Sequence, residues 1–538
     1  MHPQRRSQTR RAVQARFFSS PTPRTRAAVA LSLHAVTATN RAIPLPVLTQ
    51  PARAHPHKTP HTTYEMKEKC GVFGVWGHAQ SARLAYMGLY AQQHRGQESA
   101  GIAVTNGKVI SAHTGMGLVP EIFRNENLLK LDLAGGRGAI AHNRYSTAGG
   151  SLSCNAQPLL ENYIAGQVAV AHNGNLINAD ALRRMFEEAG HLFHTTSDTE
   201  VVVHLLASPG QQKSGDPVAA TLRHLQGAYS LLFLFPDRIE ACRDPWGWRP
   251  LVLGQTEAGE YVVASETVAL DVVGAKTIRE VEPGEIVTIN DNGISSRRFC
   301  PAAPRRAHCV FEHVYFANPA SVVFGQNVQA SREHMGEVLA KEAPPPPGID
   351  YIVPMPDSGR SAALGYARAS GVTYREAIVP NRYVGRTFIK PTQNERNMAV
   401  RLKLNIIDEL VRGKRLVIVD DSIVRGTTTK AKMDQLRAAG AKEIHLRISC
   451  PPIRHPCYFG VDFAERSQLI AHQKGSVEAI RDFLGVESLS YLSLDGLLST
   501  MHMPGEHYCT ACFSGDYRLD PEHPTTEVVL EPGQLRVF

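Results

Sequence analysis

Along roughly the first 300 residues, short apolar stretches alternate with small and polar positions at the two-residue period of β-strands. Residues 71–76 are typical of a buried strand, and a helix is predicted from Ser81, with Leu84, Met87, Gly88 and Ala91 on one face. The pattern predicts more strands at 138–141, 168–171, 228–235 and 260–264, and helices near 180–189 and 199–207. This mixture indicates stacked sheets in an α+β domain that ends near residue 300.

Beyond a connector at 299–306, strands and helices alternate instead. The continuous apolar run at 416–419 is typical of a parallel strand covered on both faces. Strands are also predicted at 351–354 and 444–448, and helices at 331–342, 360–369 and 427–439, the last ending at Gly440. Strand, helix and strand in this order form a βαβ unit, so the second domain is predicted to be α/β.

Composition and length fit more than one buried core, because the chain has 538 residues and 43% of them are apolar. No apolar run approaches the roughly 18 residues that span a bilayer, which predicts no membrane partner. Residues 1–69 hold nine Arg, three Lys and two Glu, a net charge of +10, whereas the whole chain carries +8. The rest of the chain is therefore slightly acidic, at about −2, and nucleic acid is not an expected partner.

This leader, residues 1–69, is rich in Arg, Ser, Thr, Ala and Pro, and its first acidic residue is Glu65. That composition resembles an organelle transit peptide and predicts disorder. A bacterial extension, a long propeptide and a start assigned too early, with Met66 as the true start, are the alternatives. The expected location is cytoplasmic, or a plastid or other organelle if the leader is a transit peptide.

Nine cysteines lie along the chain, at Cys70, Cys154, Cys242, Cys300, Cys309, Cys450, Cys457, Cys509 and Cys512. An odd number in a large chain without a secretory signal argues against a disulfide framework and favours catalytic or metal roles.

Cys70 stands at the start of the first predicted strand, where a lone cysteine is more often a packed residue than a nucleophile. Polar turns are predicted at 94–99, 142–147 and 172–175, and residues 197–200 open a helix. Taken singly, Asn173-Gly174 is a good hairpin turn, and Asp198 a good N-cap.

Together these five motifs resemble, over residues 70–300, the N-terminal-nucleophile class II glutamine amidotransferase domain, whose fold has four αββα layers. The resemblance implies cleavage between Lys69 and Cys70, so that the freed α-amine of Cys70 acts as general base. It also implies that Asn173 and Gly174 donate to the oxyanion. Arg144 would bind the α-carboxylate of glutamine and Asp198 its α-ammonium. Arg95 and Gly96 would lie in the loop that closes over it.

One departure from the resemblance is local. Residues 244–250 carry Trp246 and Trp248 where the family usually has His and Phe. These residues are expected to alter packing, not chemistry.

The loop after the 416–419 strand suits a phosphate. It leads into a helix, whose N-terminus presents unpaired N–H groups and the positive end of the dipole. Gly426 allows close backbone approach, and Thr427 and Thr428 add hydroxyl donors. Asp420 and Asp421 are too acidic for phosphate but suit ribose hydroxyls or a bridging metal.

This segment resembles the phosphoribosylpyrophosphate (PRPP) loop of type I phosphoribosyltransferases. The resemblance implies PRPP contacts from Asp420, Asp421, Ser422, Val424, Arg425, Gly426, Thr427 and Thr428. Residues 353–359 resemble the pyrophosphate loop, which implies that Ser358 joins Asp420 and Asp421 around Mg²⁺. Residues 381–389 resemble the mobile loop of the amidotransferase member, with Tyr383 and Arg386 over PRPP.

Cys509 and Cys512 form a C-x-x-C pair, which alone is compatible with zinc, a redox pair or a structural role. In amidotransferases that carry a [4Fe–4S] cluster, four cysteines occur in the contexts of Cys309, Cys457, Cys509 and Cys512. The resemblance therefore implies a structural cluster bound by these four, with zinc as the alternative.

The whole pattern resembles the amidophosphoribosyltransferase family. It predicts a leader at 1–69, a glutaminase domain at 70–300, a phosphoribosyltransferase domain at 307–500 and a tail at 501–538 with two cluster cysteines. The implied reaction moves the amide nitrogen of glutamine to PRPP, giving 5-phosphoribosylamine, glutamate and pyrophosphate, the first committed step of purine synthesis. Purine nucleotide feedback inhibitors and a homotetramer are implied too.

Two other functions fit the residues less well. Another class II amidotransferase would lack the Asp420-Asp421-Ser422 loop. A PRPP-sensing regulatory protein would not need the set of Cys70, Arg144, Asn173 and Asp198.

Overall fold

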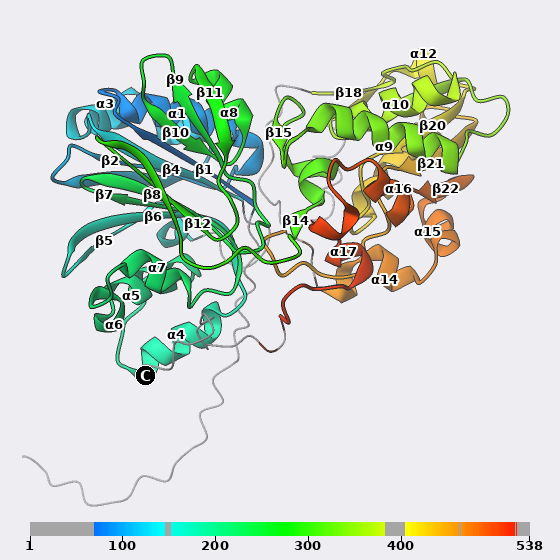
Figure 1. Ribbon diagram of the computed structural model, residues 1–538. Coiled ribbons are helices and arrows are strands. Elements are labelled where there is room, and N and C mark those ends of the chain that lie inside the picture. The colour runs from blue at the N-terminus through cyan, green and yellow to red at the C-terminus, as the bar shows by residue number, and fades with distance from the viewer. Residues whose placement is uncertain are drawn as a thin grey trace, which may run out of the picture. The chain divides into compact units, whose positions relative to one another are not determined.

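The computed structural model describes residues 69–145, 152–381, 404–461, 463, 465–521 and 523 (Figure 1). All of these residues belong to one compact unit. No helix within these ranges is long and apolar enough to cross a membrane.

Two antiparallel sheets are stacked in the first domain. The first has the order β11 (Ala275–Glu280), β9 (Val252–Thr256), β10 (Tyr261–Ala264), β1 (Lys69–Trp76), β4 (Gly138–Tyr145), β2 (Ser99–Thr105), β3 (Ile110–Met116). The second has the order β13 (Gly293–Arg298), β12 (Glu285–Asn290), β8 (Arg238–Arg243), β7 (Gly227–Phe235), β6 (Gly166–Leu176), β5 (Leu159–Tyr163).

Helices cover the outer face of each sheet. On the first lie α1 (Ser81–Ala91), α2 (Val119–Ile122), α3 (Asn125–Ala134) and α8 (Thr267–Val272). On the second lie α4 (Ala179–Glu188), α5 (Thr199–Ala207), α6 (Pro209–Gln212) and α7 (Pro217–Leu222) (Figure 1). Two 3₁₀ turns, η1 (Gln93–Arg95) and η2 (Ser153–Asn155), complete the domain.

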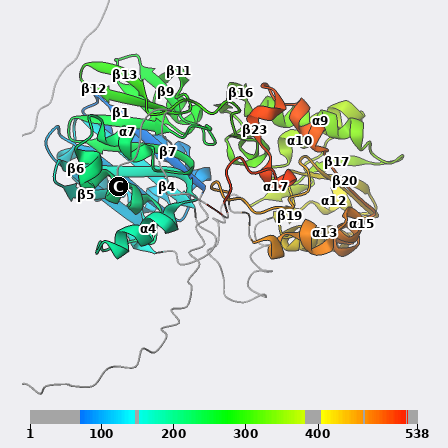
Figure 2. The same ribbon diagram turned by 60° about the horizontal axis from the view of Figure 1, so that its bottom comes forward.

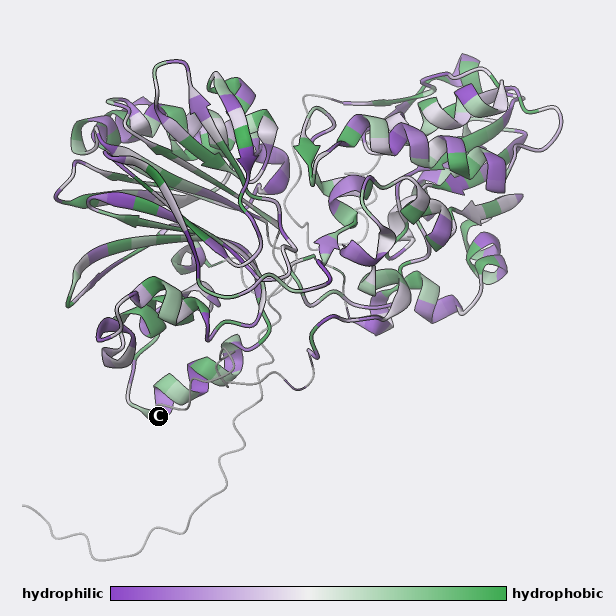
Figure 3. Cartoon of the chain, viewed as in Figure 1, coloured by the Kyte–Doolittle hydropathy of each residue, from purple (hydrophilic) through white to green (hydrophobic). Residues whose placement is uncertain are grey.

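The period of two in the sequence produces these layers. On β7, Leu231 and Phe233 pack toward the helices, while Leu232 and Leu234 pack between the sheets. The apolar colouring of Figure 3 follows these inner strands. The αββα architecture expected for the first domain is therefore confirmed.

The second domain has a four-stranded parallel sheet in the order β17 (Tyr351–Pro354), β20 (Arg415–Asp420), β21 (Glu443–Ile448), β22 (Ser488–Tyr491). The helices are α9 (Val328–Glu342), α10 (Arg360–Ser370), α12 (Asp408–Val411), α13 (Thr427–Ala438), α14 (Ile470–Lys474), α15 (Val477–Leu484), α16 (Leu494–Ser499) and α17 (Ala511–Ser514). Figure 2 shows α9 and α10 on one side of β20, and α13 and α15 on the other. The predicted α/β domain is confirmed, because Leu416–Val419 of β20 are buried on both faces.

Short elements surround this sheet. Three two-stranded ladders are β14 (His308–Cys309) with β23 (Tyr508–Cys509), β15 (Val322–Val323) with β16 (Gln326–Asn327), and β18 (Ile378–Pro380) with β19 (Leu404–Ile406). Single turns of helix are η3 (Glu312–Phe316), η4 (Arg466–Gln468) and η5 (Gly505–His507). β14 is parallel to β23, so the start of the second domain pairs with the tail.

Three local predictions were wrong in part. Residues 142–145, expected in a turn, lie in β4. The buried face of α1 includes Leu84 and Gly88 as predicted, but Met87 is 37% exposed because it lies at the edge of the stripe. Asn173 and Gly174 do not form a turn. They lie inside β6, opposite Ser230 and Tyr229 of β7.

Candidate active site

Cys70 is the second residue of β1, in the middle of the first sheet, and it is 1% exposed. Its Cα pairs with that of Arg144 on β4. Its backbone carbonyl accepts a hydrogen bond of 3.4 Å from Nη1 of Arg95. A residue on a central strand is held rigidly, which suits a nucleophile that must meet a fixed oxyanion site.

Asn173 and Gly174 approach from the other sheet, on β6. The Asn173 side-chain Nδ2 donates to Oγ of Ser265 at 3.2 Å. Ser265 Oγ also accepts from the backbone N of Val72, two residues from Cys70, at 3.0 Å. One hydroxyl therefore fixes the Asn173 carboxamide relative to the strand that carries Cys70.

Gly174 has no room for a side chain, since a β-carbon would lie 1.9 Å from the carbonyl oxygen of Ala228. This contact explains why the position must be glycine.

Asp198 does not cap α5 with its side chain. It is 2% exposed, and Oδ2 accepts from the backbone N of Leu176 at 2.9 Å. Oδ1 lies 3.4 Å from Nδ1 of His172. Burial opposes its ionisation, but His172 and the Leu176 hydrogen bond lower the pKa of Asp198 below its ordinary value. It is therefore an anion under ordinary conditions, as a partner for an ammonium group requires.

Arg144 and the Arg95–Gly96 loop meet on the same strand. Arg144, on β4, is 6% exposed and donates from Nη1 to Oε1 of Glu98 at 3.4 Å. A β-carbon on Gly96 would lie 2.6 Å from the backbone N of Arg144, so the loop packs directly on β4. Four predicted glutamine-site residues, Arg95, Gly96, Arg144 and Asp198, thus lie on elements next to Cys70 and Asn173.

The predicted PRPP loop follows β20 as expected. Asp420 ends that strand, and Gly426 is the N-cap of α13 with φ of +75°, a conformation that favours glycine. A β-carbon there would also lie 2.3 Å from Cδ1 of Ile470. Thr427 and Thr428 begin the 12-residue helix and are exposed. The N-terminal N–H groups of α13 are therefore available to a phosphate.

The paired carboxylates are buried, with Asp420 8% and Asp421 5% exposed. Burial, with the neighbouring Asp421, raises the pKa of Asp420 well above its ordinary range. Burial also lowers the pKa of Lys432, against the opposing effect of the two aspartates. Ser422 Oγ donates to Asp421. Sequence reasoning missed Lys432, the cation whose charge opposes the rise in the pKa of Asp420.

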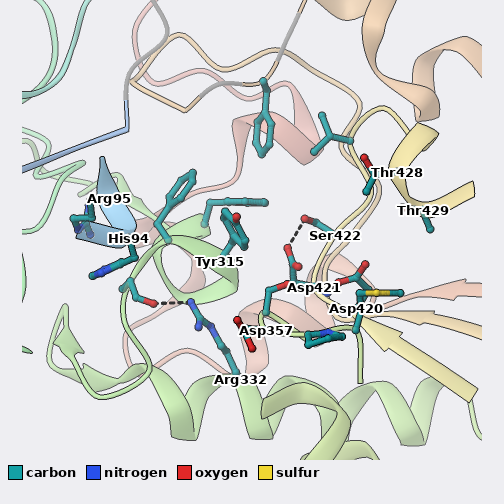
Figure 4. Close-up of a pocket in the computed structure, with 18 of the residues that line it drawn as sticks. His94, Arg95, Tyr315, Arg332, Asp357, Asp420, Asp421, Ser422, Thr428 and Thr429 are labelled. Atoms are coloured by element: carbon teal, nitrogen blue, oxygen red, sulfur yellow. Dashed lines mark hydrogen bonds between the residues drawn. The ribbon is translucent and has the colours of Figure 1, made fainter. Parts of the chain in front are cut away.

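One cavity of about 710 Å³ joins both sites (Figure 4). Cys70, His94, Arg95 and Asn173 line it from the first domain. From the second domain it is lined by Ser358, Asp420, Asp421, Ser422, Val424, Arg425, Gly426, Thr427 and Thr428. Figure 4 shows His94 and Arg95 on one side and Asp420 and Asp421 on the other. Tyr383 and Arg386, predicted to cover PRPP, lie outside the described residues.

Buried charges link the two domains beside this cavity. Arg95 forms ion pairs with Glu266 of the first domain and Glu312 of the second. Glu312 also accepts from Nη1 of Arg249 at 3.1 Å. Burial alone would lower the pKa of Arg95, but Glu312 and Glu266 raise it above its ordinary value.

Sequence reasoning missed Ser265, Glu266 and Glu312. Only the position of Ser265 and Glu266 just after a predicted strand could have drawn attention to them.

The four predicted cluster cysteines lie in one region. Cys309 and Cys509 are register partners in the β14–β23 ladder. The backbone N of His455 donates to the Cys512 carbonyl at 3.0 Å, which brings the Cys457 loop to the tail. Burial raises the pKa of Cys512, and charges on Cys457, Cys509 and Cys309 add to the effect. Within the described ranges, however, no group of three or more His, Cys, Asp or Glu side chains has metal-binding geometry.

Comparison with known proteins agrees with this arrangement. A glutamine amidotransferase domain family matches residues 142–272. The chain is 47% identical over 468 residues to chloroplastic amidophosphoribosyltransferase 1 of Arabidopsis thaliana, covering 87% of this chain and 81% of that protein. It is 46% identical over 460 residues to the amidophosphoribosyltransferase of Bacillus subtilis, covering 84% and 94%.

Among solved structures, the B. subtilis glutamine PRPP amidotransferase complexed with ADP and GMP has a TM-score of 0.77 and 45% identity. The match covers 84% of this chain and 98% of that one. Fold and site define a glutamine amidotransferase domain joined to a phosphoribosyltransferase domain. The chain belongs to the amidophosphoribosyltransferase family.

Proposed function

We propose that this protein transfers the amide nitrogen of glutamine to PRPP, producing 5-phosphoribosylamine, glutamate and pyrophosphate, and so begins purine synthesis. The observation that carries the proposal is the single cavity lined by Cys70 and Asn173 at one part and by Ser358, Asp420 and Asp421 at another. A glutaminase nucleophile and a ribose-phosphate loop border one shared cavity, as the transfer of ammonia between them requires.

In the glutamine half, the sulfur of Cys70 attacks the amide carbon. Asn173 Nδ2 and the Gly174 N–H donate to the oxyanion, each worth about 3 kcal/mol. Ammonia leaves, and water then hydrolyses the thioester to release glutamate. The general base is the α-amine of Cys70 once residues 1–69 are removed. Arg144 and Asp198 hold the charged ends of glutamine, and Arg95 and Gly96 flank it.

In the ribose half, ammonia attacks the anomeric carbon of PRPP and pyrophosphate leaves. The N-terminus of α13, with Gly426, Thr427 and Thr428, holds the ribose 5-phosphate. Asp420 and Asp421 accept from the ribose hydroxyls. The rest of the loop consists of Ser422, Val424 and Arg425. The remaining proposed PRPP contacts come from Tyr383 and Arg386, which lie outside the described residues.

Ser358, Asp420 and Asp421 would hold a magnesium ion, since their oxygens line one cavity and oxygen is the preferred ligand. Bound there, magnesium would neutralise charge on the departing pyrophosphate.

Apolar and aromatic side chains form part of the cavity wall, beside its many polar residues. Phe311, Tyr315, Phe316, Met355 and Phe463 line it. Where these side chains border the path of ammonia, they disfavour ammonium and so favour the neutral, nucleophilic form.

We further propose that Cys309, Cys457, Cys509 and Cys512 bind a [4Fe–4S] cluster. All nine cysteines lack disulfides, and Cys309 and Cys509 are register partners in the β14–β23 ladder. Four reduced thiols in one desolvated region match the donor set that such clusters use. The cluster would act structurally, by joining the start of the second domain to the tail. Zinc is the alternative occupant.

Regulation and assembly follow the family. The solved B. subtilis relative is described with ADP and GMP, which supports purine nucleotide inhibitors here. We propose a homotetramer as the assembly, testable by light scattering. The proposed location is cytoplasmic, or a plastid or other organelle if the leader is a transit peptide, as the chloroplastic names of the plant relatives allow. N-terminal sequencing of the purified protein tests both the leader and the exposure of Cys70.

Separate assays test the two-site reaction. Cys70→Ala should abolish synthesis of phosphoribosylamine from glutamine but preserve synthesis from added ammonia. Asp421→Asn should raise the KM for PRPP in both assays and leave some basal glutaminase activity. Loss of both activities in folded Cys70→Ala protein would refute the division of labour, and normal PRPP kinetics in Asp421→Asn would reduce the loop to a helix cap.

A further inference from the structure

A short segment of the second domain, residues 458–460, contacts the strand that carries the proposed oxyanion donors. We call it the docking segment. Its Tyr458 carbonyl accepts a hydrogen bond of 2.8 Å from the side-chain Nδ2 of Asn175. Asn175 directly follows Gly174 on β6. The segment therefore bonds to β6 one residue from a proposed donor.

Two first-domain residues hold the middle of the docking segment. Nη2 of Arg249 donates to the Phe459 carbonyl at 2.8 Å. The Phe459 ring stacks on Trp248, with ring centroids 4.4 Å apart and planes 17° from parallel. Phe459 is 3% and Trp248 0% exposed, so this contact is a buried anchor. Trp248 is one of the two tryptophans at which the sequence departs from the family pattern.

Gly460 makes the closest approach. A β-carbon on it would lie 3.1 Å from the carbonyl carbon of Gly174, 3.3 Å from its Cα and 2.9 Å from Nη2 of Arg249. Gly174 also abuts the Ala228 carbonyl of β7, as described above. The Gly174 backbone is therefore packed against both β7 and Gly460, one element from each domain, and we call this pair of contacts the clamp.

We propose that the docking segment is a positioning element of the glutaminase: by clamping Gly174 it sets the direction of the N–H that stabilises the oxyanion. This inference rests on the proposed function, because it assumes that Gly174 donates to the oxyanion. It deepens that function by assigning part of the glutaminase site to the second domain. A donor displaced by about 1 Å loses much of its effect on the transition state and little of its effect on substrate binding.

The sequence position of the docking segment adds a consequence. It follows Cys457, a proposed cluster ligand, without a break. A contact that fixes the position of Cys457 therefore also restrains Gly460, three residues later in the chain, and with it the clamp on Gly174. The glutaminase site is thus completed by the folded second domain, not by the first domain alone.

Gly460→Ala in the full-length protein tests the clamp. The expected result is a fall of about tenfold or more in kcat with glutamine, an unchanged KM for glutamine and unchanged activity with ammonia. Alkylation of Cys70 by iodoacetamide should proceed at the wild-type rate, because the nucleophile is untouched. A residue with a merely structural role would alter both activities together.

Gly475→Ala is the matched control. Gly475 also has a positive φ, +75° against +90° for Gly460, but nothing lies within 4 Å of its β-carbon position. It shares the backbone strain without the contact, and wild-type kinetics are expected. Equal glutamine kcat in Gly460→Ala and Gly475→Ala would overturn the proposal.

Asn175→Ala provides a second test if Gly460→Ala does not fold. It removes the hydrogen bond to Tyr458 and is expected to lower the glutamine kcat severalfold at constant KM. An unchanged kcat in this variant would also count against the clamp. Failure of the underlying function is distinguishable, since it would appear as glutaminase activity that survives Cys70→Ala.

Discussion

The Asn173 carboxamide donates to the Ser265 hydroxyl at 3.2 Å, and the same hydroxyl receives the Val72 N–H at 3.0 Å. The proposed oxyanion donor is thereby tied to β1, the strand of the nucleophile. Ser265 does not line the cavity with Cys70 and Asn173. It is a positioning residue whose effect passes through Asn173.

Ser265→Ala is therefore expected to lower kcat with glutamine by about tenfold, less than the hundredfold or more that follows loss of an oxyanion donor. The KM for glutamine and the activity with ammonia should not change. Steady-state assays with each nitrogen source measure the effect. Ser295→Ala, on an exposed position of β13, is the control. An equal loss with ammonia would indicate a folding defect instead.

Glu312→Ala should destabilise the protein by about 3 kcal/mol, because it leaves Arg95 and Arg249 buried with less compensation. Thermal unfolding followed by circular dichroism measures the change. Glu257→Ala is the control, since Glu257 and its partner Lys276 are both 81% exposed and such pairs contribute little. Equal unfolding temperatures for the two variants would show that the ion pairs of Glu312 with Arg95 and Arg249 contribute no net stability.

Local pattern predicted much of the second domain and less of the site. The apolar run of β20 and the Asp420–Asp421 pair after it are local signals, so strand and carboxylates were both predicted from neighbouring residues. Asn173-Gly174 shows the limit. The pair favours a hairpin turn by itself, but pairing with Ser230 and Tyr229 of β7, more than 50 residues away, makes it part of a strand.

The buried ion pairs that link the two domains could not be predicted from the sequence for the same reason. Arg95 and Glu312 are 217 residues apart, and neither stands in a pattern that names its partner. Burial and register decide such contacts, and both depend on the assembled sheets. The prediction of the buried face of α1 was wrong for a simpler reason. An error of one position in the apolar stripe exchanges a buried residue for the exposed Met87.

The burial of His313 predicts that acid destabilises the folded protein. It is fully buried, and neither ring nitrogen has a hydrogen-bond partner among the described residues. Burial, with Arg332 nearby, lowers the pKa of His313 to about 4 from an ordinary 6.5. The unfolded chain therefore binds a proton more readily, so stability present above pH 6.5 is lost as pH falls toward 4, by up to about 3 kcal/mol.

His313→Phe should keep the packing against Phe324 and Tyr508 and remove the imidazole that binds this proton. Its acid unfolding midpoint, followed by circular dichroism between pH 7 and 3.5, is expected to move to lower pH, with stability at pH 7 equal or greater. His502→Phe, at an exposed position, should leave the midpoint in place. A midpoint unchanged in His313→Phe would exclude His313 as a source of acid sensitivity.

The cysteines give the last prediction. Cys309 and Cys509 face each other in a ladder between segments about 200 residues apart, and a shared cluster would close that loop. Long loops lose the most chain entropy when closed, so their release should be strongly destabilising. Protein purified without oxygen is expected to be brown, with about four iron atoms per chain. Replacing Cys309, Cys457, Cys509 or Cys512 by Ser should give colourless, poorly folded protein.

Cys154→Ser and Cys450→Ser are the controls for this prediction. Cys154 is exposed, and Cys450 is buried but outside the proposed ligand set. Both variants should keep the colour and the iron, so that the loss in the other four cannot be attributed to removing any thiol, exposed or buried. Stoichiometric zinc without iron, in protein made without oxygen in cells that assemble clusters normally, would replace the iron–sulfur assignment with a zinc site.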